Sequence, residues 1–106
     1  MTKIKLLLLE GCSKCQKLKE ALGKNYIHYD YEVCKSDTVI CDSIEDAIGC
    51  SNYPIVLKMI SKSLIEEIAY ITDNYEDIGK TLSINNKVKL KPVYSIDKLI
   101  EYVINS

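Results

Sequence analysis

Two cysteines spaced three residues apart are the part of the sequence best suited to chemistry. Cys12 and Cys15 enclose Ser13 and Lys14 in a Cys-Ser-Lys-Cys stretch, which follows an apolar run and precedes a helical pattern. Such a pair can be a redox couple, half of a four-ligand metal site, or two ordinary thiols in a core. The redox interpretation is favoured, because Cys-x-x-Cys inside a strand–helix–strand pattern is typical of redox motifs.

Three further cysteines keep the metal interpretation open. Because five is an odd number, at least one thiol stays unpaired in any all-disulfide scheme, so a disulfide scaffold is the weaker interpretation. Cys34 and Cys41 are candidate zinc ligands, but their offset of seven residues differs from the tight knuckle of a zinc ribbon. Small apolar packing roles are expected for both and for Cys50. Cys50, four residues before Pro54, is also a candidate regulatory or additional resolving thiol.

A strand and a helix are predicted on either side of the Cys-Ser-Lys-Cys stretch. Residues 4–9 are a nearly continuous apolar run, as in a strand buried on both faces. From Ser13 onward, apolar residues recur three and four apart, which is typical of an amphipathic helix; they are Cys15, Leu18 and Leu22. Gly23 is a natural end for this helix. Residues 26–33 alternate as a second strand, which should run parallel to the first.

The middle of the chain predicts one more helix and two more strands. Residues 42–49 have the apolar spacing of a short helix. A third strand is predicted within residues 52–60, with Pro54 as its first residue, a position where a missing N–H is tolerated. Residues 64–71 are predicted as a strand, although their apolar spacing also fits a helix.

The last third of the chain is harder to interpret until its final helix. Asn74 could cap a short helix over residues 74–82, and residues 88–93 could be extended. Ser95 is a good N-cap for an amphipathic helix that follows it. The resulting order, β-α-β-α-β-β-α, is that of one α/β domain over residues 1–106, with helices on both faces of the sheet.

Composition narrows the partners and the compartment. The net charge is −1 over 106 residues, so no basic stripe exists to neutralise the phosphates of a nucleic acid. A monomer is also expected. The longest apolar run, residues 6–9, is far shorter than the roughly 20 residues that span a bilayer. No apolar stretch at the N-terminus suits a signal peptide. A cytoplasmic protein with no membrane partner is therefore expected, with its thiols kept reduced.

The predicted order, the Cys-Ser-Lys-Cys stretch between first strand and first helix, and the proline at the third strand together resemble the thioredoxin superfamily. Within it the chain looks most similar to a glutaredoxin, over roughly residues 3–82. The resemblance implies a thioredoxin-like fold with a four-stranded mixed sheet. It also implies a dithiol thiol–disulfide oxidoreductase that reduces disulfides of proteins or of small molecules.

The resemblance gives each member of the cysteine pair a role. Cys12 would lie at a helix N-terminus, where exposed N–H groups and the helix dipole favour a thiolate. Lys14 would add positive charge nearby. Cys12 would then attack the substrate disulfide, and Cys15, one turn further along, would resolve the mixed disulfide.

Substrate binding is implied on two other segments. Tyr53–Pro54 matches the family's cis-proline, so Tyr53 would offer backbone hydrogen bonds to a peptide or to glutathione. Asn74 and Tyr75 lie where glutaredoxins hold the γ-glutamyl end of glutathione, although Asp73 and Asn74 replace the usual glycine pair. No bound cofactor is expected, and glutathione or a reductase is the expected electron donor.

A function of another class stays open beside the enzyme. The chain could be a non-catalytic thioredoxin-like binding module, or its thiolates could hold a metal ion or an iron–sulfur cluster. Such a cluster would be shared between two copies and would need glutathione. His28, the only histidine, is expected to be a solvated imidazole on the wetter face of its strand.

Overall fold

The computed structural model describes residues 3–106, and the apolar run before the cysteine pair forms its strand β1, Lys3–Leu8. Helix α1 follows over Ser13–Lys24, and strand β2 occupies Asp30–Val33. The two strands pair in parallel, because the helix between them returns the chain to the starting end of the sheet. The predicted strand–helix–strand unit is therefore confirmed, although its second strand begins at Asp30 and not at residue 26.

The middle of the chain also has the predicted elements. Helix α2 covers Val39–Ile48, three residues earlier than its predicted start at residue 42, and Gly49 ends it in the left-handed conformation. Strands β3, Ile55–Ser61, and β4, Leu64–Ile71, form an antiparallel pair. The strand prediction for residues 64–71 is confirmed over its helical alternative.

The last third of the chain contains two strands that the predicted order lacks. A single 3-10 turn, η1, covers Tyr75–Asp77, and strand β5, Leu82–Ile84, follows where the end of a helix was expected. Strand β6, Val88–Val93, leads into helix α3, Ile96–Ile104. Ser95 accepts a hydrogen bond from the Lys98 N–H at 3.2 Å, which confirms the predicted N-cap of α3.

The predicted four-stranded thioredoxin-like sheet is wrong. The chain is an α/β protein, but its mixed sheet has six strands in the order β2-β1-β3-β4-β6-β5. The order along the chain is β-α-β-α-β-β-β-β-α, counting strands and α-helices only. β6 pairs in parallel with β4, and β5 pairs antiparallel with β6. β4 is therefore an internal strand and not the edge that a four-stranded sheet would make it.

Two local features explain the additional strands. The last four residues of β4, residues 68–71, are all buried, so this end of the strand needs neighbours on both sides. Asn85 and Asn86 both have positive φ angles, 53° and 58°, and the Lys87 N–H bonds the Ile84 carbonyl at 3.0 Å. That is a two-residue hairpin turn of the type that asparagine favours. The turn joins β5 to β6, and the resulting hairpin covers the outer edge of β4 through β6.

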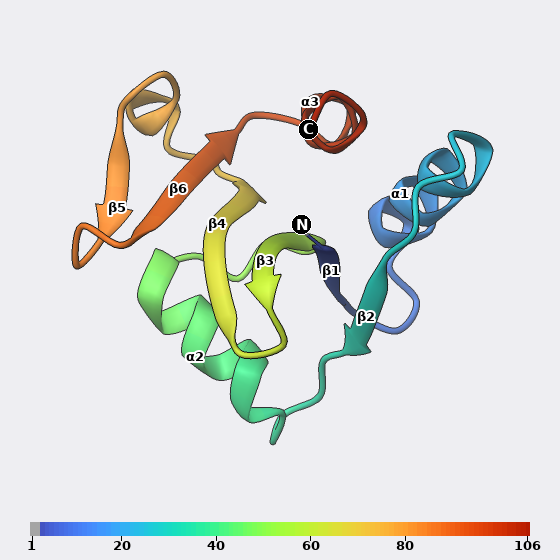
Figure 1. Cartoon of the computed structure of the whole chain (residues 1–106), viewed down its shortest axis with the longest axis horizontal. Helices are drawn as coiled ribbons and strands as arrows, with labels where there is room; N and C mark the ends of the chain where they lie inside the picture. Colours follow the sequence, from blue (N-terminus) through green and yellow to red (C-terminus); the bar gives the residue numbers. More distant parts are fainter. Residues whose placement is uncertain (1–2) are drawn as a thin grey trace.

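The helices lie on both faces of the sheet (Figure 1). α1 and α3 pack against each other on one face, where Lys17 and Asp97 form a 2.8 Å ion pair, and α2 lies on the other. The core is formed by buried apolar side chains from β1, β3, β4 and β6 and from all three helices. Within residues 3–106, no helix combines the length and the apolar character that crossing a membrane requires.

Candidate functional site

The cysteine pair lies where the chain leaves β1 and enters α1. Gly11 has a φ of 73°, a left-handed conformation that favours glycine, and it turns the chain toward the helix. Cys12 is the N-cap of α1, with extended backbone angles. Its sulfur accepts a hydrogen bond from the Cys15 N–H at 3.1 Å. The start of α1 thus places a partly exposed sulfur against the free N–H groups of a helix, which stabilise negative charge there.

Cys12 and Cys15 are joined by a disulfide, with their Cα atoms 5.2 Å apart. Cys12 is half-buried, whereas only 3% of Cys15 is exposed. Cys15 shares its buried face with Leu18 and Leu22, one and two turns further along α1. A molecule approaching from solvent therefore meets the sulfur of Cys12 first, and that of Cys15 lies behind it.

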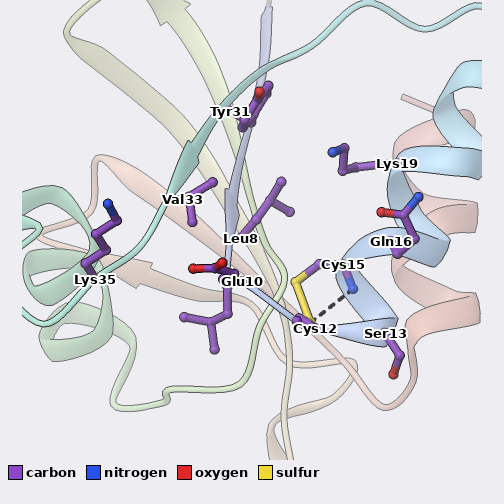
Figure 2. Close-up of a pocket in the computed structure, with 12 residues that line it drawn as sticks. Leu8, Glu10, Cys12, Ser13, Cys15, Gln16, Lys19, Tyr31, Val33 and Lys35 are labelled. Carbon is purple, nitrogen blue, oxygen red and sulfur yellow. Dashed lines mark hydrogen bonds between the residues drawn. A yellow bond between two sulfur atoms is a disulfide. The ribbon is translucent and has the colours of Figure 1, made fainter.

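A groove of about 640 Å³ opens beside the pair, between α1 and β2 (Figure 2). Its floor comes from the end of β1 and the following loop, residues 8–12. One wall is formed by the α1 side chains, and the opposite wall by β2 and the loop that follows it. These walls carry Cys15, Gln16, Lys19, Tyr31, Val33 and Lys35. This volume falls in the range of sites that hold drug-sized ligands, so more than a bare disulfide fits beside Cys12.

Three charged side chains line this α1–β2 groove. Glu10 lies close to the pair, and Lys19 and Lys35 face the groove from its two walls. The Lys19 ammonium lies 5.3 Å from the centre of the Tyr31 ring, within reach of a cation–π contact. Neither lysine has a carboxylate within 4.0 Å among the residues that the structure describes. The groove therefore has a small excess of positive charge.

The three predicted site residues nearest the pair are placed differently from one another. Lys14 lies in the first turn of α1 and is exposed, but it is outside the α1–β2 groove. The Tyr53–Pro54 peptide bond is cis, as the resemblance implied. Pro54 immediately precedes β3, whose Ile55 pairs with Leu7, so this bend lies at the end of the sheet where β1 finishes.

The side chain of Tyr53 turns away from the groove. It is buried, and its hydroxyl donates a hydrogen bond to the Glu45 carboxylate of α2 at 2.6 Å. Burial, together with the neighbouring Glu45, raises the pKa of the Tyr53 phenol far above its usual value of 10.0. Tyr53 therefore stays neutral and fastens α2 to the loop before β3 through its side chain, leaving only its backbone for the predicted substrate contact.

We expect Tyr53→Phe to lower the free energy of unfolding by about 1.5 kcal/mol, because one hydrogen bond to a charged group is lost. The difference in unfolding free energy between wild type and variant should stay constant from neutral pH up to about pH 10. It should become smaller above pH 10, because the tyrosine ionises in the unfolded chain but not in the folded one. Urea unfolding at several pH values measures it. Disulfide-reduction activity should be unchanged, and a large activity loss would show that the hydroxyl serves the substrate.

Asn74 and Tyr75 lie after β4, at the same end of the sheet as the cysteine pair. Asn74 caps the η1 turn by accepting a hydrogen bond from the Glu76 N–H at 3.2 Å, and its side-chain amide donates to Asp77 at 3.2 Å. Tyr75 is 69% exposed. Within residues 3–106, the side chains that line the α1–β2 groove do not include these two residues or Tyr53 and Pro54.

The structure corrects the expectation that Cys34 and Cys41 are simple packing residues. They form a second disulfide, with Cα atoms 5.9 Å apart, which joins the end of β2 to the first turn of α2. Both are buried, at 7% and 1% exposure. Because neighbouring strand residues point to opposite faces, Val33 lines the groove while Cys34 points toward α2. The second disulfide is thus on the far side of the sheet from the groove.

Cys50 is the free thiol among the described residues. It is half-buried in the loop before β3, and its sulfur donates a hydrogen bond to the Ile71 carbonyl at 3.3 Å. The Asn52 amide donates to the same carbonyl at 3.2 Å. Cys50 therefore helps to hold this loop against the end of β4, and its regulatory or resolving role stays a prediction.

Sequence reasoning missed the groove residues other than the cysteines. The sequence pattern alone assigns no site role to Lys19 or Tyr31. Their spacing carried a signal: Lys19 lies one helical turn after Cys15, and Tyr31 has the same strand face as Val33. That signal needs the position of β2 relative to α1, which only the folded chain supplies.

Comparisons with known protein families, with curated protein sequences and with solved structures find no match. The geometry of the site therefore carries the functional argument alone. Among residues 3–106, no three histidine, cysteine or carboxylate side chains are gathered where they could hold one metal ion.

Proposed function

We propose that this protein is a glutaredoxin-like thiol–disulfide oxidoreductase that reduces disulfides of proteins or small molecules through Cys12 and Cys15. The observation that carries the proposal is the pairing of a partly exposed Cys12 sulfur at the N-cap of α1 with a buried Cys15 one turn behind it. That arrangement supplies one sulfur for attack from solvent and a second that is reachable only from the first.

The reaction starts from the reduced pair. The Cys12 thiolate attacks one sulfur of the substrate disulfide, the substrate S–S bond breaks, and the other substrate sulfur leaves and takes up a proton. The Cys15 thiol then loses its proton and attacks the Cys12 sulfur of the mixed disulfide. The Cys12–Cys15 disulfide forms and the second substrate thiol is released, so two electrons have passed from the protein to the substrate.

The hydrogen bond from the Cys15 N–H and the dipole of α1 support the first step. Both stabilise negative charge on the Cys12 sulfur, and at such sites the thiol pKa lies below the value of about 8.5 for free cysteine. Glu10, which lines the same groove, opposes this effect. Because the backbone N–H bonds the sulfur directly, we expect its effect to exceed that of the exposed carboxylate.

The electron donor and the compartment belong to the same proposal. A thiol donor, either glutathione or a dithiol reductase, would return the pair to its reduced form in a cytoplasmic setting. The Cys34–Cys41 disulfide is unusual for such a compartment. Its burial slows attack by the same donor, because exchange requires access to a sulfur. We therefore propose a dithiol cycle at Cys12 and Cys15, with the second disulfide left intact.

A single-turnover experiment tests the proposed function. Protein reduced at Cys12 and Cys15 is freed of reductant and mixed with a peptide disulfide, and released thiol and protein disulfides are then measured together. We expect about two thiols per protein molecule, with the new protein disulfide mapped to Cys12–Cys15 by mass spectrometry. Release of no thiol from a protein whose two cysteines are demonstrably reduced would contradict the enzyme.

A second measurement on the same preparation distinguishes a metal-binding function from the redox enzyme. Zinc and iron contents of the reduced protein, purified without chelators, should be far below one ion per chain if the pair is a redox couple. A stoichiometric metal that protects Cys12 from alkylation would instead favour a thiolate metal site.

A further inference from the structure

The α1–β2 groove extends well beyond the cysteine pair. Lys19 lies four residues after Cys15 on α1, which corresponds to about 6 Å along a helix. On the opposite wall, Tyr31 lies two residues before Val33, which corresponds to about 7 Å along a strand. Both walls therefore bring a side chain to the same level of the groove, one step away from the pair.

At that level, Lys19 and Tyr31 approach each other across the groove (Figure 2). The lysine ammonium lies 5.3 Å from the ring centre, and Tyr31 is 55% exposed. Lys19 is half-buried and has no carboxylate partner among the described residues. The ring limits where the ammonium can point, but its N–H groups stay free to bind an anion.

The spacing of this contact matches an extended polypeptide. Alternate side chains of an extended chain point the same way and are about 7 Å apart. Lys19 lies seven residues after Cys12, about 10 Å along the helix, but its long side chain leans back toward the helix N-terminus. A substrate cysteine placed on Cys12 would thus direct a side chain two residues away toward the Lys19 ammonium and Tyr31. An aspartate or glutamate there would pair with the Lys19 ammonium, which has no carboxylate partner among the described residues.

The other two charged residues of the groove do not oppose a preference for an acidic side chain beside Lys19. Glu10 and Lys35 have opposite signs and lie nearer the Cys12 end, where β1 and β2 finish. Their effects on a distant substrate carboxylate largely offset each other. Lys19 is therefore the charge that distinguishes one substrate side chain from another at this position.

We infer that the α1–β2 groove binds the polypeptide around a substrate disulfide and prefers an acidic side chain two residues from the substrate cysteine. This inference rests on the proposed function, because it assigns a substrate class to the same cysteine pair. The groove lies on the β2 side of Cys12, so the selecting residues are distinct from the Tyr53–Pro54 bend.

The test uses short peptides whose single cysteine carries a chromophoric thiol in a mixed disulfide. Aspartate, asparagine or lysine is placed two residues before or two residues after the cysteine, and kcat/KM is measured at low salt with a thiol donor. For one of the two placements, we expect the aspartate peptide to exceed the asparagine peptide by about threefold, as for a partly exposed ion pair. The preference should fall with added salt.

Charge substitutions at Lys19 identify the residue responsible. Lys19→Gln should abolish the preference for aspartate, and Lys19→Glu should change it to a preference for lysine. Lys24→Glu is the matched control, because Lys24 is an exposed lysine in the last turn of the same helix and outside the groove. It makes the same change in net charge and should keep the wild-type order of the peptides.

Hydroxyethyl disulfide, a small neutral disulfide, distinguishes a failure of the inferred substrate preference from a failure of the proposed function. Lys24→Glu should reduce this disulfide at the wild-type rate, because Lys24 lies outside the groove, and the rate of each Lys19 variant on this compound is the reference for its peptide preference. A wild type that is active on this compound but treats all the peptides alike would overturn the inference and leave the proposed function standing. A wild type inactive on every substrate would overturn the proposed function. Loss of activity on the neutral compound in Lys19→Gln would show that Lys19 acts on Cys12 and not on the substrate.

Discussion

Cys12→Ser is expected to lose disulfide-reduction activity by more than about a thousandfold, because it removes the nucleophile itself. A serine hydroxyl at the N-cap of α1 can still accept the hydrogen bond that the Cys12 sulfur accepts from the Cys15 N–H. The fold should therefore be preserved, and the loss should be chemical. The measurement is the rate of reduction of a peptide disulfide with a thiol donor, with circular dichroism to check the fold.

Cys15→Ser should behave differently, because it removes only the second step. Attack by Cys12 still forms the mixed disulfide, but no buried thiol is left to release the substrate. We expect a covalent protein–substrate adduct of stoichiometric amount, visible by mass spectrometry and reversed by a reductant. The rate of adduct formation should fall at pH values below the pKa of Cys12, since only the thiolate attacks.

Cys50→Ser is the matched control for both substitutions. Cys50 is a half-buried cysteine outside the groove, so its removal tests the general effect of losing a thiol. We expect activity close to that of the wild type and no trapped adduct. Undiminished activity in Cys12→Ser, or an adduct attached to Cys50 in Cys15→Ser, would refute the assigned roles.

The first two-thirds of the fold could be predicted because local signals there agree with one another. The run before Cys12 is apolar throughout, and the helix after it has one apolar face that includes Leu18 and Leu22. A strand buried on both faces and a helix buried on one have different periods, so each could be identified without the other. α1 accordingly begins at the predicted residue, Ser13.

The end of the sheet was mispredicted because its signals are short and depend on a distant strand. β5 has only three residues, too few to show alternation. β6 alternates clearly over Val88–Lys91, but it is a strand of this sheet only because β4 has an edge to cover. The turn at Asn85 and Asn86 was the usable signal, since consecutive asparagines with positive φ angles are typical of tight hairpins.

The candidate site also contains some features that could be predicted from the sequence and others that could not. Cys12 and Cys15 could be predicted from a short motif whose geometry is set locally, whereas the cis bond before Pro54 was implied only by the resemblance to the thioredoxin superfamily. The groove could not be predicted, because its walls come from two elements whose separation depends on the packing of the whole sheet. The Cys34–Cys41 disulfide was missed for a related reason: seven residues of separation alone do not show that a strand end meets the start of a helix.

Removing the Cys34–Cys41 disulfide should strongly destabilise the fold. The double variant Cys34→Ala/Cys41→Ala should lose about 2.5 kcal/mol of unfolding free energy, because the bond closes a loop of eight residues in the unfolded chain. For a domain of this size, that loss corresponds to a fall in Tm of roughly 10–15 °C. Chemical and thermal unfolding of the oxidised proteins measure the loss.

The chemistry at Cys12 should survive this substitution. The Cys34–Cys41 bond lies on the α2 face of the sheet, whereas the cysteine pair and its groove lie on the α1 face. At a temperature where both proteins are folded, we expect the double variant to reduce a small neutral disulfide at the wild-type rate. An unfolded double variant would itself exceed the predicted loss, and an active-site defect in a folded one would show that the two disulfides exchange electrons.

A reductant titration gives an independent measurement of the same bond. In the variant Cys12→Ser/Cys15→Ser, Cys34–Cys41 is the remaining disulfide, so any change in stability on reduction belongs to it. We expect reduction there to need stronger conditions than reduction of Cys12–Cys15 in the wild type, because the Cys34 and Cys41 sulfurs are buried while Cys12 is open to solvent. If Cys34–Cys41 were instead reduced first, it could not remain intact during the proposed cycle. That result would contradict the proposal that only Cys12 and Cys15 change their redox state.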